Sequence, residues 1–160
     1  MSTPEDTAPA TRPIRPIGWR EVVALPELGL TEVRAKIDTG ARSSALHATD
    51  LEPFTRDGRD WMRFHVPHDD AEAWDCEAPL LGERDVRNTS GTPETRPVIE
   101  TLLILGSRRW RIEVTLADRA DMKLPLILGR TAVRRHRLLV DPGRSWLLGP
   151  PVLTNQKGTR

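Results

Sequence analysis

The stretch that decides the fold is Ala35-Lys36-Ile37-Asp38-Thr39-Gly40-Ala41. An alternating, β-type run ends there in a carboxylate, and the Thr-Gly pair that follows it predicts a tight turn. Far along the chain a second apolar run, Leu124-Pro125-Leu126-Ile127-Leu128, ends on Gly129-Arg130. The two runs together predict a lobe that presents Asp38 on a turn. The sequence has one Asp-Thr-Gly, so a site that needs two such carboxylates would need two copies of the chain.

The composition predicts a single folded domain built mainly from short strands. The chain has 160 residues, which is enough to bury a core without disulfides or metals. Its 14 prolines and 11 glycines favour turns and short strands over long helices. Lys and Arg number 24 and Asp and Glu number 23, and the resulting net charge of +1 gives no support to a general nucleic-acid surface.

The sequence also predicts a soluble, cytoplasmic protein. The single cysteine, Cys76, excludes an internal disulfide and indicates a reducing compartment. No apolar run approaches the ~18 residues that a membrane-spanning helix requires, so no membrane contact is expected. Residues 1–15 are polar and rich in Pro and Thr, and they lack the apolar segment of a secretory signal.

Turn signals divide the chain into short strands between two tails. Residues 1–15 and 151–160 are predicted to be disordered tails on either side of one domain at 16–150. Asp57-Gly58 predicts a type I′ hairpin turn, and Thr131–Arg137 is the one short helix expected. The acidic residues 67–80 are expected to be irregular. Strands are expected at 17–25, 30–38, 46–54, 61–66, 98–105, 109–116, 138–140 and 146–148.

The chain resembles the retropepsin-like aspartic peptidases over about residues 17–148, well beyond the bare Asp-Thr-Gly. It is most similar to a bacterial family labelled as ATP-dependent zinc proteases, whose members are associated with ATP-grasp glutamate ligases. The matching stretches are Ile17-Gly18-Trp19-Arg20-Glu21, residues 35–48, Arg96-Pro97-Val98, Leu126-Ile127-Leu128-Gly129-Arg130-Thr131 and Val140-Asp141-Pro142.

This resemblance implies an all-β, retropepsin-like closed barrel lobe with one short helix, which works as a homodimer. Its catalytic residues would be Asp38, Thr39 and Gly40, with a water activated between the Asp38 carboxylates of two copies. The hairpin at 84–97 would be the flap over the site, and residues 124–130 would support the Asp38 turn. The residues expected to bind substrate are Ala41, Arg42, Asn88, Ser90, Gly91, Arg96 and Arg130.

Arg42 departs from the family pattern. Viral retropepsins carry an Asp at this position, where it helps to hold substrate and pairs with the arginine that matches Arg130. Two arginines cannot form that pair, so Arg42 needs another anion. We expect Arg42, together with Arg96, to bind acidic side chains or a carboxylate terminus of the substrate. The alternative is a structural ion pair of Arg42 with Asp50 or Asp141.

The label of the resembling family does not match the residues of this chain. The sequence lacks the Gly-x-x-x-x-Gly-Lys-Ser/Thr loop that binds ATP phosphates. It also lacks the His-Glu-x-x-His motif of zinc proteases. We therefore expect no cofactor and no metal. His65, His68 and Cys76 are the candidate metal ligands, and their spacing matches no known four-ligand pattern.

A Ser-His-Asp triad of a serine hydrolase is an alternative catalytic site. Ser43-Ser44, His47 and Asp50 supply the residue types, but Gly-x-Ser-x-Gly is absent and the residues are too close in sequence to face one another. His47 either contacts the Asp38 site or bonds the backbone near it.

The sequence thus leads to two hypotheses about function. The first is an aspartic peptidase that hydrolyses peptide bonds in acidic, glutamate-rich or glutamylated tails, with a functional link to a glutamate ligase. The second is a catalytically silent module of the same fold that binds acidic tails and regulates the ligase. A metal-dependent peptidase is a third hypothesis, with little in the sequence to favour it.

Overall fold

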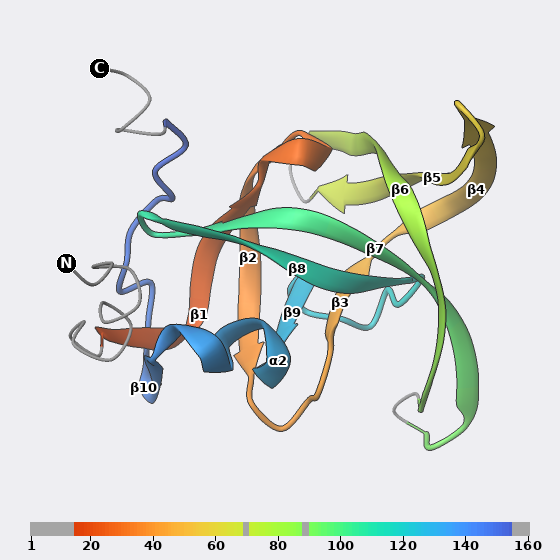
Figure 1. The fold of residues 1–160 in the computed structure, drawn as a ribbon. Helices are drawn as coiled ribbons and strands as arrows, with labels where there is room; N and C mark the ends of the chain where they lie inside the picture. The colour runs from red at the N-terminus through yellow and green to blue at the C-terminus, as the bar shows by residue number, and fades with distance from the viewer. Residues whose placement is uncertain (1–14, 69–70, 88–89, 155–160) are drawn as a thin grey trace, which may run out of the picture.

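A computed structural model describes residues 15–68, 71–87 and 90–154 of the chain. The described chain is all β except for three short helical segments (Figure 1). Its elements are β1 (Arg15–Leu25), η1 (Pro26–Leu28), β2 (Leu30–Asp38), β3 (Ser44–His47), β4 (Thr49–Arg56), β5 (Arg59–His68), β6 (Ala71–Arg87), β7 (Pro93–Leu105), β8 (Arg108–Ala117), β9 (Leu126–Gly129), α2 (Arg130–Val133), η2 (Arg134–His136) and β10 (Leu138–Ser145).

The strands pair in the order β10-β1-β2-β9-β3-β8-β7-β6-β5-β4. An additional pairing of β1 with β7, at Ala24 and Ile104, links six of the strands in a ring. β10 lies at one end of the order, and β6, β5 and β4 extend from the other. Figure 1 shows the β4–β5 hairpin at the opposite end of the molecule from β10.

The pairing of β2 with β9 places the two signature segments side by side. The strands run parallel, in a register that sets Ala35 opposite Leu126 and Asp38 opposite Gly129. β2 alternates as the sequence predicts, with Val33, Ala35 and Ile37 buried and the residues between them exposed. Burial of this apolar face fixes the register, because a slip by one residue would turn it toward water.

The core lies inside this set of strands and is mainly aliphatic. Leu25, Leu30, Leu46, Ile99 and Leu126 are each fully buried. Removal of such side chains from water is the main favourable contribution to folding. The Asp38 turn therefore projects from a strand that is anchored along its whole length.

Buried Glu21 ties β1 to the segment that follows β10. Its carboxylate accepts hydrogen bonds from the backbone N–H groups of Gly18 (2.6 Å), Leu147 (3.0 Å) and Leu148 (3.2 Å). The Gly18 bond is buried and the Leu147 and Leu148 bonds are partly buried, so water has limited access to these donors. Glu21 therefore acts as a structural link between two distant parts of the chain.

We expect Glu21→Ala to lower the free energy of unfolding by about 3 kcal/mol, because it leaves three backbone donors without an acceptor. Urea titration followed by tryptophan fluorescence measures the change. Glu32→Ala, at an exposed position of β2, is the control and is expected to stay within about 0.5 kcal/mol of the parent protein. Equal midpoints for the two variants would contradict the structural role of Glu21.

Several predicted elements are confirmed. The type I′ turn forms at Asp57-Gly58, where φ is 52° and 76° and β4 pairs with β5. The strands predicted at 98–105 and 109–116 lie within β7 and β8, and the short helix is present as α2 followed by η2. The fold is all β, as the sequence predicts.

Three local predictions are wrong. Most of residues 67–80 is not irregular, because β6 begins at Ala71 and pairs along β5, with Phe64 opposite Cys76. The predicted strand at 46–54 is broken at Ala48, and the two parts join different ladders. The strand predicted at 138–140 continues as β10 to Ser145 beside β1, and residues 146–148, also predicted as a strand, are not in one.

The chain continues to contact the sheet beyond the predicted domain end at residue 150. The backbone N–H of Val152 donates to the carbonyl of Gly106 (2.8 Å), and the Arg109 guanidinium donates to the carbonyl of Leu153 (2.9 Å). Residues 1–14 and 155–160 of the predicted tails lie outside the described residues. Over the described chain, no helix has the length and apolar character to span a bilayer.

Candidate active site

The Asp38 turn is built by its own backbone. β2 ends at Asp38, and the N–H of Gly40 donates to the Asp38 Oδ1 at 3.1 Å. The N–H of Ala41 then donates to the Asp38 carbonyl, also at 3.1 Å, which closes the turn. A carboxylate that accepts a backbone N–H is held in one orientation. The Thr-Gly pair thus fixes the direction of the Asp38 side chain.

Residues at the β9–α2 junction donate hydrogen bonds to the loop that follows Asp38. The N–H of Arg130 donates to the carbonyl of Ala41 (2.8 Å), and the hydroxyl of Thr131 donates to the carbonyl of Arg42 (2.8 Å). The Arg130 guanidinium is within 3.5 Å of the carbonyls of Thr39 and Gly40. Arg130 therefore contacts the backbone of the turn.

Gly129 is required where the two segments cross. A Cβ at this position would lie 2.5 Å from the backbone oxygen of Ser43 and 2.8 Å from its nitrogen. The Gly129 N–H donates to the hydroxyl of buried Ser44 at 3.1 Å. Only a residue without a side chain lets the β9 backbone approach the Asp38 loop this closely.

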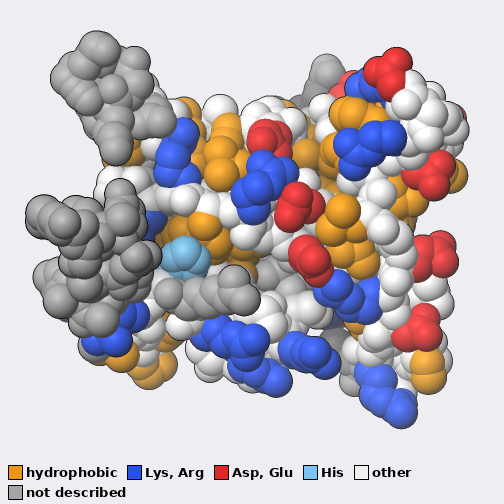
Figure 2. All heavy atoms as spheres, viewed as in Figure 1, with side chains coloured by type: hydrophobic (Ala, Val, Ile, Leu, Met, Phe, Trp, Pro, Cys, Tyr) orange, Lys and Arg blue, Asp and Glu red, His pale blue; other side chains and the backbone are white. Residues whose placement is uncertain are grey.

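Asp38 lies at the wall of a cleft of about 860 Å³. The cleft is bounded by β2 and its following loop, by β6 and β7, and by β8. Figure 2 shows Lys and Arg side chains gathered along the lower edge of the molecule, where Figure 1 places α2 and the turn after β2. Six cationic side chains line the cleft: Lys36, Arg42, Arg84, Arg87, Arg96 and Arg119. Only three carboxylates line it: Asp38, Asp85 and Glu113.

Part of this positive charge is not neutralised by the protein. Arg84 donates to Glu113 at 2.5 Å, and Arg119 lies 3.6 Å from Asp121. Within residues 15–68, 71–87 and 90–154, by contrast, the exposed side chains of Lys36 and Arg42 form no hydrogen bond or ion pair. The excess positive charge of the cleft thus favours the binding of anions.

The proposed structural ion pair of Arg42 does not form among the described residues. The Asp50 carboxylate accepts from the hydroxyl of Thr49 (3.2 Å), and the Asp141 carboxylate accepts from the N–H of Gly143 (2.9 Å). Arg42 instead lines the cleft beside Asp38.

The structure brings together some of the predicted site residues. Four of them line the cleft: Asp38, Ala41, Arg42 and Arg96. Thr39 and Gly40 are exposed on the turn next to it, and Arg130 lies against their carbonyls. Ser90 and Gly91 lie at the end of the β6–β7 hairpin, where the Gly91 carbonyl accepts from Arg87 (2.9 Å). Asn88 lies outside the described residues.

Several residues that line the cleft were not predicted from the sequence. Lys36 could have been found, since a residue two positions before Asp38 projects from the same face of the strand. Arg84 and Arg119 reach the cleft only because β6 pairs with β7 and the segment after β8 crosses the site. No local sequence signal places them there.

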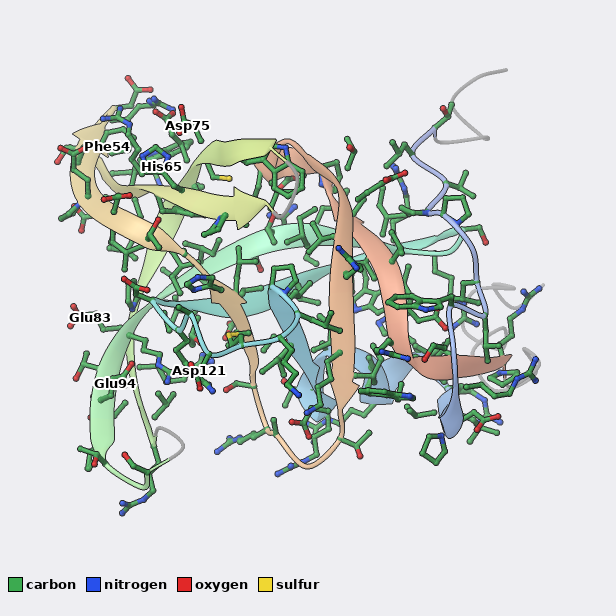
Figure 3. The ribbon with its side chains drawn as sticks, turned by 180° about the vertical axis from the view of Figure 1, so that it is seen from behind. Phe54, His65, Asp75, Glu83, Glu94 and Asp121 are labelled. Atoms are coloured by element: carbon green, nitrogen blue, oxygen red, sulfur yellow. The ribbon has the colours of Figure 1, made fainter. Side chains whose placement is uncertain are left out.

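The other polar candidates have structural partners. His47 Nδ1 accepts from the N–H of Arg119 (2.9 Å), so this ring bonds the backbone, and Ser44 supports Gly129. His65 Nδ1 contacts Asp75, as Figure 3 shows on the β5–β6 pair. Burial, with a smaller contribution from the nearby Asp75 charge, raises the pKa of Cys76 to about 12. Over the described chain, no three His, Cys, Asp or Glu side chains group as metal ligands, and the side chain of His68 is not described.

Several known proteins are similar to this chain. Relatives named "Probable alpha-L-glutamate ligase" are 39% identical in Desulfotalea psychrophila, 44% in Parasynechococcus marenigrum and 35% in Shewanella pealeana. Each match covers 83% of this chain but only 29–30% of the relative, so the chain spans less than a third of the length of these relatives. The crystal structure of Lpg0085, a Legionella pneumophila protein of unknown function, superposes with a TM-score of 0.74 at 29% identity and covers 84% of this chain and 98% of that one.

A family model matches most of the chain, including the segments that form the Asp38 turn. The model described as "Retropepsin-like aspartic endopeptidase RimB" matches residues 16–150, which include the Asp38 turn, the β6–β7 hairpin and Gly129. The chain therefore belongs to the RimB-like family of retropepsin-like aspartic endopeptidases.

Proposed function

We propose that this chain is one half of a homodimeric aspartic peptidase, with a closed barrel lobe in each copy. The observation that carries the proposal is the Asp38 carboxylate, fixed by the Gly40 N–H at the wall of a cationic cleft. One lobe supplies one such carboxylate, and a two-fold axis beside Asp38 would bring in the second. Thr39 and Gly40 are exposed on the turn, which leaves them accessible to the loop of the other copy.

In this proposal the two Asp38 carboxyl groups share one proton. Two carboxylates about 3 Å apart cannot both ionise, so one is the base and the other the acid. The ionised Asp38 takes a proton from water while the water oxygen bonds to the scissile carbonyl carbon. The protonated Asp38 gives its proton to the carbonyl oxygen. The tetrahedral intermediate then collapses: the Asp38 that took the proton from water gives it to the leaving nitrogen, the other Asp38 takes a proton from a hydroxyl of the intermediate, and the C–N bond breaks.

The charge of the cleft supports acidic peptides as substrates. Lys36 and Arg42 face the cleft without a neutralising partner among the described residues, so a glutamate-rich or glutamylated tail would be attracted to them. The relatives named as glutamate ligases support a functional link between this domain and the formation of such tails. Cleavage of an oligoglutamate peptide and of its glutamine analogue, followed by mass spectrometry, tests the proposal.

A silent binding module is the alternative function, favoured by the names of the long relatives. In that case the purified protein would bind the oligoglutamate peptide without cutting it, and Asp38→Ala would bind equally well. Time-dependent appearance of two product fragments in the parent protein, and not in Asp38→Asn, excludes this alternative.

We expect Arg42→Ala to raise KM for an oligoglutamate peptide about 3- to 10-fold, because the exposed guanidinium contributes a screened attraction. Initial rates at 50 mM and 500 mM NaCl measure the effect. The variant should show a weaker salt dependence than the parent, whereas KM for the glutamine analogue should not change. An unchanged KM for both peptides would show that Arg42 does not contact acidic substrate.

A further inference from the structure

We infer that Arg96 is the residue that selects an acidic side chain of the substrate, a role that rests on the proposed peptidase function. Arg96 lies on β7 and lines the same cleft as Asp38. Its side chain is only 6% exposed. A cationic side chain that is buried to this extent normally has all its donors paired.

The hydrogen bonds of Arg96 are incomplete. Its Nε donates to Glu94 Oε2 at 2.8 Å, and Figure 3 shows Glu94 on the β6–β7 hairpin. Its Nη2, which carries two N–H donors, is buried and has no partner among the described residues. An unpaired donor in a buried guanidinium lowers stability. The unpaired N–H groups of Arg96 Nη2 are therefore candidates for donating to a ligand.

A second observation points the same way. Arg96 lies directly opposite Arg84 in the antiparallel ladder of β6 and β7, and both residues line the cleft. Like charges at directly opposed positions destabilise a sheet. Glu113 and Glu94 offset part of this repulsion, since each accepts from one of the two arginines. A carboxylate from the substrate would offset the rest.

The chemistry of the guanidinium defines the ligand class. Arginine donates along a planar edge and matches a carboxylate better than a neutral amide does. Because Arg96 is shielded from water, its attraction for an anion is screened much less than that of exposed Arg42. Arg96 thus distinguishes Glu or Asp from Gln or Asn at one substrate position, while Glu94 positions the guanidinium.

The test separates binding from hydrolysis. Asp38→Asn is used as the background protein, and its affinity for fluorescent peptides that differ by one Glu-to-Gln change is measured by anisotropy. Adding Arg96→Gln should reduce the preference for the Glu peptide by about 30-fold or more at one peptide position. Arg96→Lys should recover part of it, because the charge remains and the planar fork is lost. Arg59→Gln, at an exposed site beside the β4–β5 turn, is the control and should retain the full preference.

A second variant guards against misfolding. Arg96→Gln combined with Glu94→Gln removes both members of the pair, so that no carboxylate loses its partner, and thermal unfolding verifies that it folds. A Glu preference that stays within about twofold of the background in both folded variants would overturn the inference and make Arg96 a structural partner of Glu94.

The remaining outcomes separate this inference from the proposed function. Arg96-dependent binding of the Glu peptide without hydrolysis by the parent protein would support the inference and contradict the peptidase proposal. Hydrolysis that depends on Asp38 but shows no preference for Glu would support the peptidase proposal and contradict the inference about Arg96. Absence of both binding and hydrolysis would contradict both.

Discussion

Asp38→Asn is expected to lower kcat/KM toward an acidic peptide by at least about 10⁴-fold, because neither copy can then act as the base or carry the shared proton. The fold should not change, since the amide oxygen of asparagine can still accept the Gly40 N–H that now bonds Asp38 Oδ1. Progress curves with a quenched fluorescent peptide measure the rate, and urea titration measures the stability. The change is isosteric, so loss of activity would be assigned to chemistry and not to packing.

Asp85→Asn is the matched control for this substitution. Asp85 lines the same cleft and accepts a hydrogen bond from the hydroxyl of Thr95 (2.8 Å), which an asparagine oxygen can also accept. Its variant should retain activity within about threefold. Equal rates for Asp38→Asn and the parent protein would remove Asp38 from the reaction. An equally large loss in Asp85→Asn would show that cleft charge in general, and not Asp38, controls the rate.

Gly129→Ala is expected to have the second largest effect and to act on both stability and activity. The new methyl group would overlap the backbone of Ser43, which cannot move away without disturbing the hydrogen bonds that hold the Asp38 turn. We expect a loss of about 3 kcal/mol in the free energy of unfolding. Any folded fraction should hydrolyse peptides at least about 100-fold more slowly, because displacement of the proposed catalytic carboxylate is costly. Urea titration and rate measurements on the same preparation give both values.

Gly143→Ala serves as the comparison for this glycine. A Cβ at Gly143 would meet only the Asp141 side chain, at an ordinary contact distance of 3.6 Å, and Gly143 is not among the glycines with positive φ. Its stability should therefore stay within about 0.5 kcal/mol of the parent. If Gly129→Ala behaved in the same way, the close crossing of β9 and the Asp38 loop would not be essential.

The sequence predicted the parts of the fold that depend on local pattern. The alternation of β2 is confirmed, and it was predictable because side chains of a strand repeat every two residues. The turn at Asp57-Gly58 is also confirmed, and it was predictable because this pair tolerates positive φ. The strand through Cys76 was missed because its acidic neighbours, Asp75 and Glu77, suggested a loop. Glu77 is held there by Arg56 of β4 and Arg63 of β5, long-range contacts that periodicity does not reveal.

The site was predictable to the extent that its residues are close in sequence to Asp38. Ala41 and Arg42 follow the turn, and the structure places both at the cleft. Arg96 came from the family resemblance and not from local pattern. Arg84 and Arg119 were missed because their positions depend on the pairing of strands far apart in the chain.

The pairing of two Asp38 carboxylates is the central claim, and a mixing experiment tests it most directly. Parent protein and Asp38→Asn are combined at equal concentrations, allowed to exchange, and assayed on an acidic peptide. Random pairing of subunits that each supply one essential carboxylate predicts about one quarter of the activity of the same total amount of parent protein. An activity of about one half, in a mixture shown to have exchanged subunits, would mean that each chain works alone and would contradict the claim.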